Sequence, residues 1–260
     1  ALMRSVATEA CRRAANGLEF LERTRAETGI DLEIISTTEE AKLAFSGCMP
    51  LLERAGGFAI VFDIGGGSTE LGWIQIEPGH HPRIIAWHSM PLGVVTLTEH
   101  FGAEAAPDET PAEFYERMVV EVQDDLAPFA QALGAHRLIA RSRVQLLGTS
   151  GTVTTLSGIR MELPRYDRSV VDGSFLEFGD VERISKRLSE QGCVERATNP
   201  CIGTERADLV VSGCAILSAI CRQWPIGRLR VADRGVREGI LMSLMTGTAP
   251  DSVYLRGVPA

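Results

Sequence analysis

The chain has 260 residues, 45% of them apolar and 23% charged, which is enough to bury one large core or two ordinary ones. Its net charge of −8 argues against a protein that binds nucleic acid or another polyanion through bulk positive charge. Any polyanion must therefore be held locally, by backbone N–H groups, metal ions and a few placed arginines. No apolar run approaches the ~20 residues of a membrane-spanning helix and no secretory signal is visible, so we expect no membrane partner.

The six cysteines form neither a CxxC pair nor a zinc-like spacing with histidine. Such usage is typical of reduced thiols in the cytosol. It predicts a cytoplasmic protein.

The first 55 residues predict two strands and two helices. Ala10, Ala14, Leu18 and Leu21 recur at helical spacing, which indicates one helix over residues 9–28. The predicted order is a strand at 4–8, that helix, a strand at 31–36, and a helix capped by Thr37 or Thr38. These elements are too few to cover a sheet, so the chain either begins inside a domain or borrows an edge from a partner, which leaves a homodimer open.

A second unit is expected over residues 56–235, because Gly56 and Gly57 break the chain. It opens with a meander of strands at 58–63, 70–76 and 83–88. There follow a helix at 111–133, a strand at 144–147, helices at 179–191 and 206–222, and a strand at 229–231. Residues 236–260 supply a C-terminal helix and a tail that we expect to pack back toward residues 1–55. Strands alternating with helices predict an α/β fold with mixed sheets.

The segment Asp63-Ile-Gly-Gly-Gly-Ser68-Thr-Glu70 is the most informative local pattern. Gly65, Gly66 and Gly67 follow a buried strand, where they let the backbone approach a ligand and offer N–H groups to an anion. Ser68 adds a hydroxyl donor, Asp63 can hold a hydrated Mg²⁺, and Glu70 can point into the same cleft. The alternative is a hairpin turn with spare glycines. The flanking Asp, Ser and Glu favour a phosphate-binding loop.

A second loop, Gly148-Thr-Ser150-Gly151-Thr152, links a strand to a helix. The free N–H groups of a helix N-terminus therefore face whatever binds there. The alternative is a plain helix cap by Ser150 or Thr149. Two loops of this kind favour an anion site that includes Ser150, Gly151 and Thr152. Neither loop matches the P-loop of Walker-type kinases or the GxGxxG of dehydrogenases.

Hydrolysis at a phosphate bound by such loops needs a base for the water and positive charge around the phosphoryl group. Glu39 and Glu40 open a helix just after a strand, but two glutamates in a first turn are, on this pattern alone, better explained by the helix dipole. Thr8, Arg12 and Asn16 fall on one face of the helix predicted over 9–28. A lone arginine in such a place is usually a solvated charge.

The segment LPRYDRSVVDG at residues 163–173 carries Arg165, Asp167, Arg168 and Asp172. These charges are too dense for a plain linker. A binding segment and a surface ion-pair cluster are the two explanations, and the density favours the first.

Together these patterns resemble the Ppx/GppA family of the actin-like, ribonuclease-H-like ATPase superfamily. The matching segments are TEACRRAAN (8–16), EIISTTEEAKLAFSG (33–47), FDIGGGSTEL (62–71), GTSGTVTTLSGI (148–159), LPRYDRSVVDG (163–173), ERADLVVSGCAIL (205–217) and ADRGVREGIL (232–241). The resemblance covers nearly the whole chain. It implies two ribonuclease-H-like domains with mixed sheets, the first incomplete, and a cleft between them that works with Mg²⁺.

The resemblance also implies roles for particular residues. Glu40 falls on the proposed catalytic base, and Asp63 and Glu70 fall on the metal and catalytic positions. The residues expected to bind phosphate are Arg12, Asn16, Gly65, Gly66, Gly67, Ser68, Ser150, Gly151, Thr152, Arg165 and Arg168. The expected activity is release of orthophosphate from the end of inorganic polyphosphate. The alternatives are hydrolysis of guanosine pentaphosphate (pppGpp) or binding of phosphate or an alarmone without catalysis; a sugar or acetate kinase on the same fold is weakened by the EEA and RYDR segments.

One departure from the family concerns its first phosphate loop. Family members open with a DxGSNSxR loop on an N-terminal strand, and nothing before Ala1 supplies it. We therefore expect a truncated first domain, self-association and little or no activity from the 260-residue chain. Ser36-Thr-Thr-Glu-Glu-Ala-Lys42 also replaces the usual SGxEEAR, and the C-terminal helical extension of longer members is not seen.

Overall fold

The computed structural model describes residues 3–134, 139, 144–246 and 256–257. Its main sheet has the strand order β7-β8-β6-β3-β4-β5-β9 and contains both parallel and antiparallel pairs. The strands are β3 Gly57–Ile64, β4 Thr69–Ile76, β5 Arg83–Met90, β6 Val144–Thr149, β7 Phe175–Glu177, β8 Arg228–Ala232 and β9 Arg256–Gly257. The predicted α/β class with mixed sheets is confirmed.

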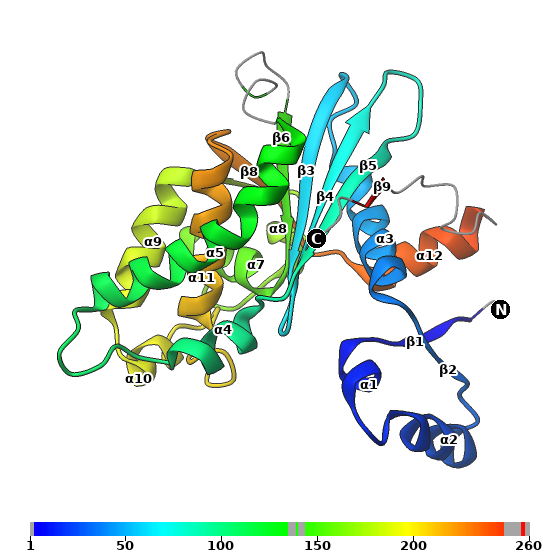
Figure 1. Cartoon of the computed structure of the whole chain (residues 1–260), viewed down its shortest axis with the longest axis horizontal. Helices are drawn as coiled ribbons and strands as arrows, with labels where there is room; N and C mark the ends of the chain where they lie inside the picture. Colours follow the sequence, from blue (N-terminus) through cyan, green and yellow to red (C-terminus); the bar gives the residue numbers. More distant parts are fainter. Residues whose placement is uncertain (1–2, 135–138, 140–143, 247–255, 258–260) are drawn as a thin grey trace.

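The central strand β3 pairs antiparallel with β4 and parallel with β6. Its residues Ile60, Val61 and Phe62 are all buried, although they alternate between the two faces of the sheet. A continuous apolar run of this kind is stable only where both faces are covered. Figure 1 shows helices on both sides of β3.

One face of the sheet is covered by a layer of long helices (Figure 1). The main members are α5 Pro111–Leu133, α7 Gly151–Arg160, α9 Phe178–Glu190 and α11 Val210–Gln223. Twelve consecutive residues of α11, from Val210 to Cys221, are buried. The largest hydrophobic cluster lies in this layer and reaches from Phe62 on the sheet to Trp224 after α11.

The other face is covered by α3 Thr37–Cys48, which in turn contacts α12 Val236–Thr246. Phe45 of α3 is fully buried against Gly72 of β4, where a Cβ atom would lie 2.7 Å from the phenyl ring. The two helices approach closely because Gly239 of α12 has no side chain. A Cβ on Gly239 would lie 2.0 Å from the carbonyl oxygen of Leu43. Helix α3 therefore shares a core with the sheet that follows it, and the division of the chain at residues 55 and 235 stays a prediction. Beyond Thr246, the predicted tail lies outside the described residues except for β9.

The remaining unit consists of two short strands that pair in parallel and two helices. Its elements are β1 Ser5–Ala7, α1 Glu9–Arg13, α2 Gly17–Thr28 and β2 Leu32–Ile34. The prediction of one helix over 9–28 is wrong, because Ala14 is extended with ψ 130° and the chain turns there. Gly17 then packs so tightly on Cys11 that a Cβ would lie 2.2 Å from the Cys11 carbonyl oxygen. Arg12 and Asn16 consequently do not share a helical face.

Other boundaries differ in smaller ways. Ser36, and not Thr37 or Thr38, caps α3, since its hydroxyl accepts a hydrogen bond from the N–H of Glu39 at 3.1 Å. Helix α11 begins at Val210, later than expected. The short elements η1 Met49–Leu51, α4 Val94–Phe101, α8 Arg168–Val171, α10 Cys193–Ala197 and β7 were not predicted.

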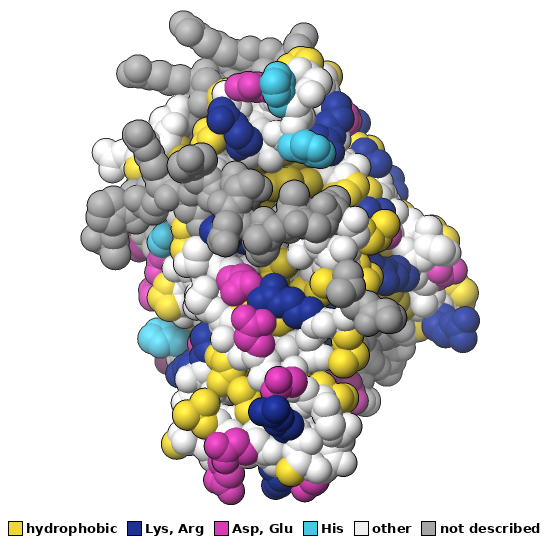
Figure 2. All heavy atoms as spheres, turned by 90° about the vertical axis from the view of Figure 1, so that its right-hand side faces the viewer, with side chains coloured by type: hydrophobic (Ala, Val, Ile, Leu, Met, Phe, Trp, Pro, Cys, Tyr) yellow, Lys and Arg dark blue, Asp and Glu magenta, His cyan; other side chains and the backbone are white. Residues whose placement is uncertain are grey.

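The surface carries charges of both signs. Figure 2 shows acidic and basic side chains interspersed with apolar ones on the side of the molecule that faces right in Figure 1. Among the described helices, none combines the length and the apolar character needed to cross a membrane.

Candidate active site

A cavity of about 740 Å³ lies where the small N-terminal unit faces the main sheet. Helix α1 and the first turn of α3 form one wall, and the β3–β4 loop with α4 forms the other. The lining residues are Thr8, Glu9, Ala10, Arg13, Ala14, Glu40, Ala41, Ala44, Asp63, Gly65, Gly66, Gly67, Ser68, Glu70, Val95, Thr96 and Glu99. The structure thus brings the glycine loop, Asp63, Glu70 and Glu40 to one place.

The glycine loop closes the β3–β4 hairpin. Gly65 donates its N–H to the carbonyl of Ser68 at 2.9 Å, while the N–H groups of Gly66, Gly67 and Ser68 donate to no other residue in the described chain. None of the three glycines has a positive φ, but a Cβ on Gly65 would lie 3.0 Å from the carbonyl oxygen of Ser68, so the turn itself favours glycine at residue 65 alone. A Cβ on Gly66 or Gly67 would make only ordinary contacts, at 3.5 Å to Val95 and 3.8 Å to Glu9. At Gly66 and Gly67, the lack of a side chain therefore leaves room for a ligand in the cavity and is not needed to form the turn.

Asp63 and Glu70 are register partners across the hairpin, so their side chains leave the same face of the sheet. Oε1 of Glu70 accepts hydrogen bonds from the hydroxyls of Ser68 at 2.6 Å and Ser89 at 3.0 Å. Burial, followed by the charges of Glu70 and Glu40, raises the pKa of Asp63 to about 7. Burial also raises the pKa of Glu70, against the lowering effect of the Ser68 and Ser89 hydrogen bonds.

These two carboxylates fit a hydrated divalent cation. Mg²⁺ typically keeps several waters and binds through one or two carboxylates together with phosphate oxygens. No group of three or more His, Cys, Asp or Glu able to cage a metal occurs among the described residues, so Asp63 and Glu70 would need oxygen ligands from water and substrate. A cation between them would also offset the repulsion by Glu70 that, after burial, raises the pKa of Asp63.

Glu40 enters the cavity from the opposite wall. It and Glu39 stand in the first turn of α3, and the structure separates them: Glu39 pairs with Arg4 at 2.6 Å, whereas Glu40 lines the cavity. Oε2 of Glu40 accepts from the Arg12 guanidinium at 2.6 Å. The helix dipole favours both side chains, but only Glu40 is placed to act on a ligand.

Arg12 is held by the protein itself. Besides Glu40, it donates to Oε2 of Glu9 at 2.9 Å and to the carbonyl of Ile35 at 2.7 Å. Asn16 was expected to lie beside Arg12. It is instead exposed, immediately before α2, and does not line the cavity. Arg13 lines the cavity instead. The prediction of a single helix over residues 9–28 missed it, because that helix would place Arg12 and Asn16 on the face toward the ligand.

The second loop lies on the neighbouring strand, since Thr149 of β6 is the register partner of Asp63. Ser150 has an unusual φ of 145° and caps α7 by accepting a hydrogen bond from Val153. The side chain of Thr152 packs against Gly213 of α11 and faces the core. None of Ser150, Gly151 and Thr152 lines the cavity, so their contact with phosphate stays a prediction.

The charged segment at 163–173 connects to the start of α12. Arg168 donates to Glu238 at 2.6 Å and to the carbonyl of Asp233, and Arg234 pairs with Asp172 at 2.8 Å. Arg165 is exposed and makes no ion pair with a described residue. Neither Arg165 nor Arg168 lines the cavity, and phosphate binding by them also stays a prediction.

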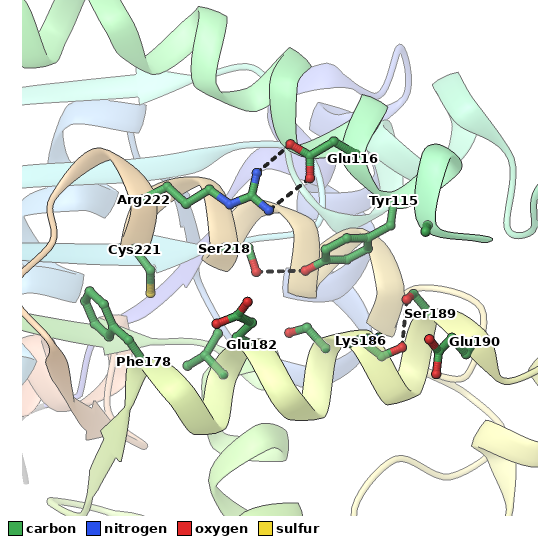
Figure 3. Close-up of a pocket in the computed structure, with 13 residues that line it drawn as sticks. Tyr115, Glu116, Phe178, Glu182, Lys186, Ser189, Glu190, Ser218, Cys221 and Arg222 are labelled. Carbon is green, nitrogen blue, oxygen red and sulfur yellow. Dashed lines mark hydrogen bonds and ion pairs between the residues drawn. The ribbon is translucent and has the colours of Figure 1, made fainter. Parts of the chain in front are cut away.

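A second cavity, of about 460 Å³, lies between α5, α9 and α11 (Figure 3). Arg222 binds both carboxylate oxygens of Glu116, and the hydroxyls of Tyr115 and Ser218 bond to each other at 2.8 Å. Four polar side chains of this cavity are thus paired with one another, and the buried hydroxyl of Ser185 has no hydrogen-bond partner among the described residues. None of the residues expected from the sequence to act on phosphate lines it.

Known proteins resemble this chain over most of its length. The Ppx/GppA phosphatase family matches residues 2–247. Exopolyphosphatase 2 of Mycobacterium tuberculosis is 30% identical over 251 residues, which are 93% of this chain and 74% of that protein. The crystal structure of the Aquifex aeolicus member of the Ppx/GppA family has a TM-score of 0.75 at 29% identity, over 94% of this chain and 74% of that one.

The fold is supported further by the crystal structure of an exopolyphosphatase from Cytophaga hutchinsonii, with a TM-score of 0.79 at 24% identity over 95% of this chain and 76% of that one. Ppx/GppA structures have the actin-like, ribonuclease-H-like fold, so the predicted fold is confirmed. By sequence and by structure, the chain belongs to the Ppx/GppA phosphatase family.

Proposed function

We propose that this chain is an exopolyphosphatase, which hydrolyses the terminal phosphoanhydride bond of inorganic polyphosphate with the help of Mg²⁺. The observation that carries the proposal is the single cavity shared by the N–H groups of the glycine loop, the paired carboxylates Asp63 and Glu70, and Glu40 from the facing wall. Phosphoryl transfer needs these three kinds of group: donors for the phosphate oxygens, ligands for a cation, and a base for water.

Each group has a defined part in the proposed reaction. The N–H groups of Gly66, Gly67 and Ser68 bind oxygens of the terminal phosphoryl group. Asp63 and Glu70 would hold Mg²⁺, which would supply the positive charge that the phosphate oxygens need. Glu40 takes a proton from a water molecule whose oxygen bonds to the terminal phosphorus, while the bond from that phosphorus to the bridging oxygen breaks. Orthophosphate and a chain shorter by one phosphate are the products.

The charges of the cavity support a substrate that arrives with cations. Its lining includes the carboxylates of Glu9, Glu40, Asp63, Glu70 and Glu99 and one arginine, Arg13. A bare polyanion would be repelled from such a surface. A chain of phosphates carrying Mg²⁺ would instead present positive charge to the carboxylates and oxygens to the loop.

Release of orthophosphate from polyphosphate and from pppGpp, each with Mg²⁺ and with EDTA, tests this proposal. We expect faster release from polyphosphate, abolished by EDTA. Release from pppGpp alone would identify the chain as a guanosine pentaphosphate phosphohydrolase. Binding of either compound without any release would make it a non-catalytic binding protein, and release unaffected by EDTA would remove the cation from the reaction.

A further inference from the structure

The glycine loop is held from behind by the segment that follows β5. The N–H of Val94 donates to the carbonyl of Gly65 at 2.9 Å, and the N–H of Val95 donates to the carbonyl of Gly66 at 2.8 Å. The hydroxyl of Thr96 accepts from the N–H of Gly93 at 2.8 Å, and its own proton has two acceptors in reach, the carbonyl of Gly67 at 3.4 Å and that of Gly93 at 3.3 Å. The first turn of α4 thus faces the carbonyl groups of three consecutive loop residues and binds those of Gly65 and Gly66 through backbone N–H groups.

Gly93 lets this contact form. A Cβ at residue 93 would lie 2.4 Å from the carbonyl oxygen of Gly66 and 2.6 Å from that of Gly65. Both neighbours are backbone atoms, which cannot rotate away as a side chain could. Any residue larger than glycine would therefore push the loop and the helix apart.

Helix α4 is itself fixed to the interior. Leu97 is fully buried in the main core. On the far side of the helix from the loop, the Thr98 hydroxyl bonds to that of Ser212 in α11 at 2.6 Å. Just before the helix, the carbonyl of Leu92 accepts from the hydroxyl of Thr69 at the start of β4 at 2.7 Å. The support behind the loop is therefore tied to both the helical layer and the sheet.

We infer that α4 is a brace for the phosphate-binding loop, and that Gly93 and Thr96 are positioning residues for phosphate. A peptide whose carbonyl is fixed has its N–H fixed in the opposite direction, because the peptide unit is planar. With the carbonyls of Gly65, Gly66 and Gly67 turned toward α4, the N–H groups of Gly66, Gly67 and Ser68 are directed away from the helix and into the cavity. Donors that already point toward the ligand lose less conformational entropy on binding than donors that must reorient.

The inference rests on the proposed function, since it assigns the brace to the same phosphate site. Its test therefore includes a measurement that needs no turnover. Thr96→Val removes the hydroxyl at nearly constant size, and Thr96→Ser restores it. Thr24→Val makes the same change in α2, where the hydroxyl donates to the carbonyl of Phe20 at 2.8 Å and no residue of the helix lines the cavity.

We expect Thr96→Val to weaken binding of inorganic phosphate, measured by calorimetric titration, and to raise the KM for polyphosphate, each about fivefold for one lost hydrogen bond. Thr96→Ser and Thr24→Val should stay near the wild type. The amide exchange of Val94 and Val95 should become faster in Thr96→Val, because their hydrogen bonds to the loop loosen. A merely structural role would instead lower kcat through the folded fraction and leave KM and phosphate affinity unchanged.

Gly93→Ala should have the larger effect. Displacing the loop by a fraction of an ångström is expected to lower kcat/KM about 10²-fold. Gly179→Ala is the matched control, because nothing lies within 4 Å of the position of its Cβ. If Gly93→Ala fails to fold, the Thr96 series decides alone.

The outcomes separate the brace from the proposed function. A wild-type protein that releases no phosphate from polyphosphate refutes the function, while weaker phosphate binding and faster exchange in Thr96→Val would still support the brace. Unchanged phosphate affinity, KM and amide exchange in Thr96→Val would overturn the brace even in a fully active enzyme. If the wild type binds no phosphate at all, the assignment of the loop as a phosphate site is refuted and the inference falls with it.

Discussion

The two walls of the cavity are held in different ways. The wall formed by the β3–β4 hairpin and α4 is fixed by strand pairing, backbone hydrogen bonds and buried side chains such as Leu97. The opposite wall contains α1, which has no buried residue and is linked to α3 by the ion pair between Arg12 and Glu40. The groups that fit phosphate and a cation are thus built on the rigid wall. The candidate base, Glu40, stands on α3, which packs on the sheet through Phe45, and its partner Arg12 belongs to the part of the wall held by charged side chains.

This difference separates the groups that bind the ligand from the group proposed to activate water. Groups that must hold a ligand in one orientation benefit from a scaffold that is already ordered. The side chain of Glu40 is oriented by a partly exposed ion pair with Arg12, and such pairs are weak and sensitive to salt. Changes on the two walls should therefore affect different measured quantities.

The largest effect is expected for Glu40→Gln. The substitution keeps size and hydrogen bonding and removes the base, so kcat should fall by about 10²-fold or more, with an unchanged Tm. Glu39→Gln is the control, since Glu39 is the neighbouring residue in the same turn but pairs with Arg4 and does not line the cavity. Equal kcat values for Glu40→Gln and the wild type would exclude Glu40 from the reaction.

On the rigid wall, Gly66→Val should act on binding. The added side chain occupies the space in which phosphate would meet the loop N–H groups, and affinity for phosphate should fall about 10-fold or more if two hydrogen bonds are lost. The fold should survive, because the nearest atom to the new Cβ is Val95 Cγ2 at 3.5 Å. Wild-type affinity in this variant, measured by calorimetry, would show that the loop is only a turn.

Arg12→Lys tests the ion-paired wall. Lysine keeps the charge but loses the geometry that lets one guanidinium reach Glu9, Glu40 and the carbonyl of Ile35. We expect kcat/KM to fall about three- to tenfold and the remaining activity to become more sensitive to ionic strength. Arg4→Lys, on the outside of the same wall, should change activity by less than about twofold; equal losses in both variants would contradict a special role for Arg12.

The smallest effect is on stability and concerns Asp63. Its pKa is raised to about 7 in the folded protein, above the ordinary value of 3.8. The folded state therefore binds more protons than the unfolded state between these values, and stability is lost as pH rises from about 4 to 7. In EDTA at pH 8, Asp63→Asn should raise Tm by about 4 °C, with a smaller gain at pH 5.

Magnesium provides the control for that prediction. It should raise the Tm of the wild type at pH 8, since it binds the folded state, and should do so much less for Asp63→Asn. A wild-type Tm that does not respond to Mg²⁺ would contradict the assignment of Asp63 as a metal ligand.

Much of the fold could be predicted where local chemistry and packing agree. Helix α5 spans Pro111–Leu133 as expected, because Thr110 caps it, Pro111 opens it and Gly134 closes it in a left-handed conformation. The β3–β4 hairpin was likewise recognisable from its apolar strand and its glycines. In both cases the signals lie next to one another in the sequence.

The parts that could not be predicted depend on contacts between distant residues. The apolar spacing over residues 9–28 is helical throughout, and only the packing of Gly17 on Cys11 reveals the break. Helix α4 has eight residues, and its start is fixed by carbonyls from a loop nearly 30 positions earlier. The separation of Glu39 from Glu40 follows from Arg4 and Arg12, neither of which is adjacent to them in the sequence.

The register of the β3–β4 hairpin limits where the chain can change in length. Asp63 and Glu70 face the same side only because four residues, Gly65 to Ser68, separate the paired ends of β3 and β4. One residue inserted there would shift the pairing and turn Glu70 to the opposite face. The exposed turn at residues 77–81 joins β4 to β5 at the opposite end of β4, and none of its residues lines the cavity. An epitope tag or a fluorescent label placed in that turn should leave the carboxylate pair intact, whereas the same insertion at the glycine loop should destroy it.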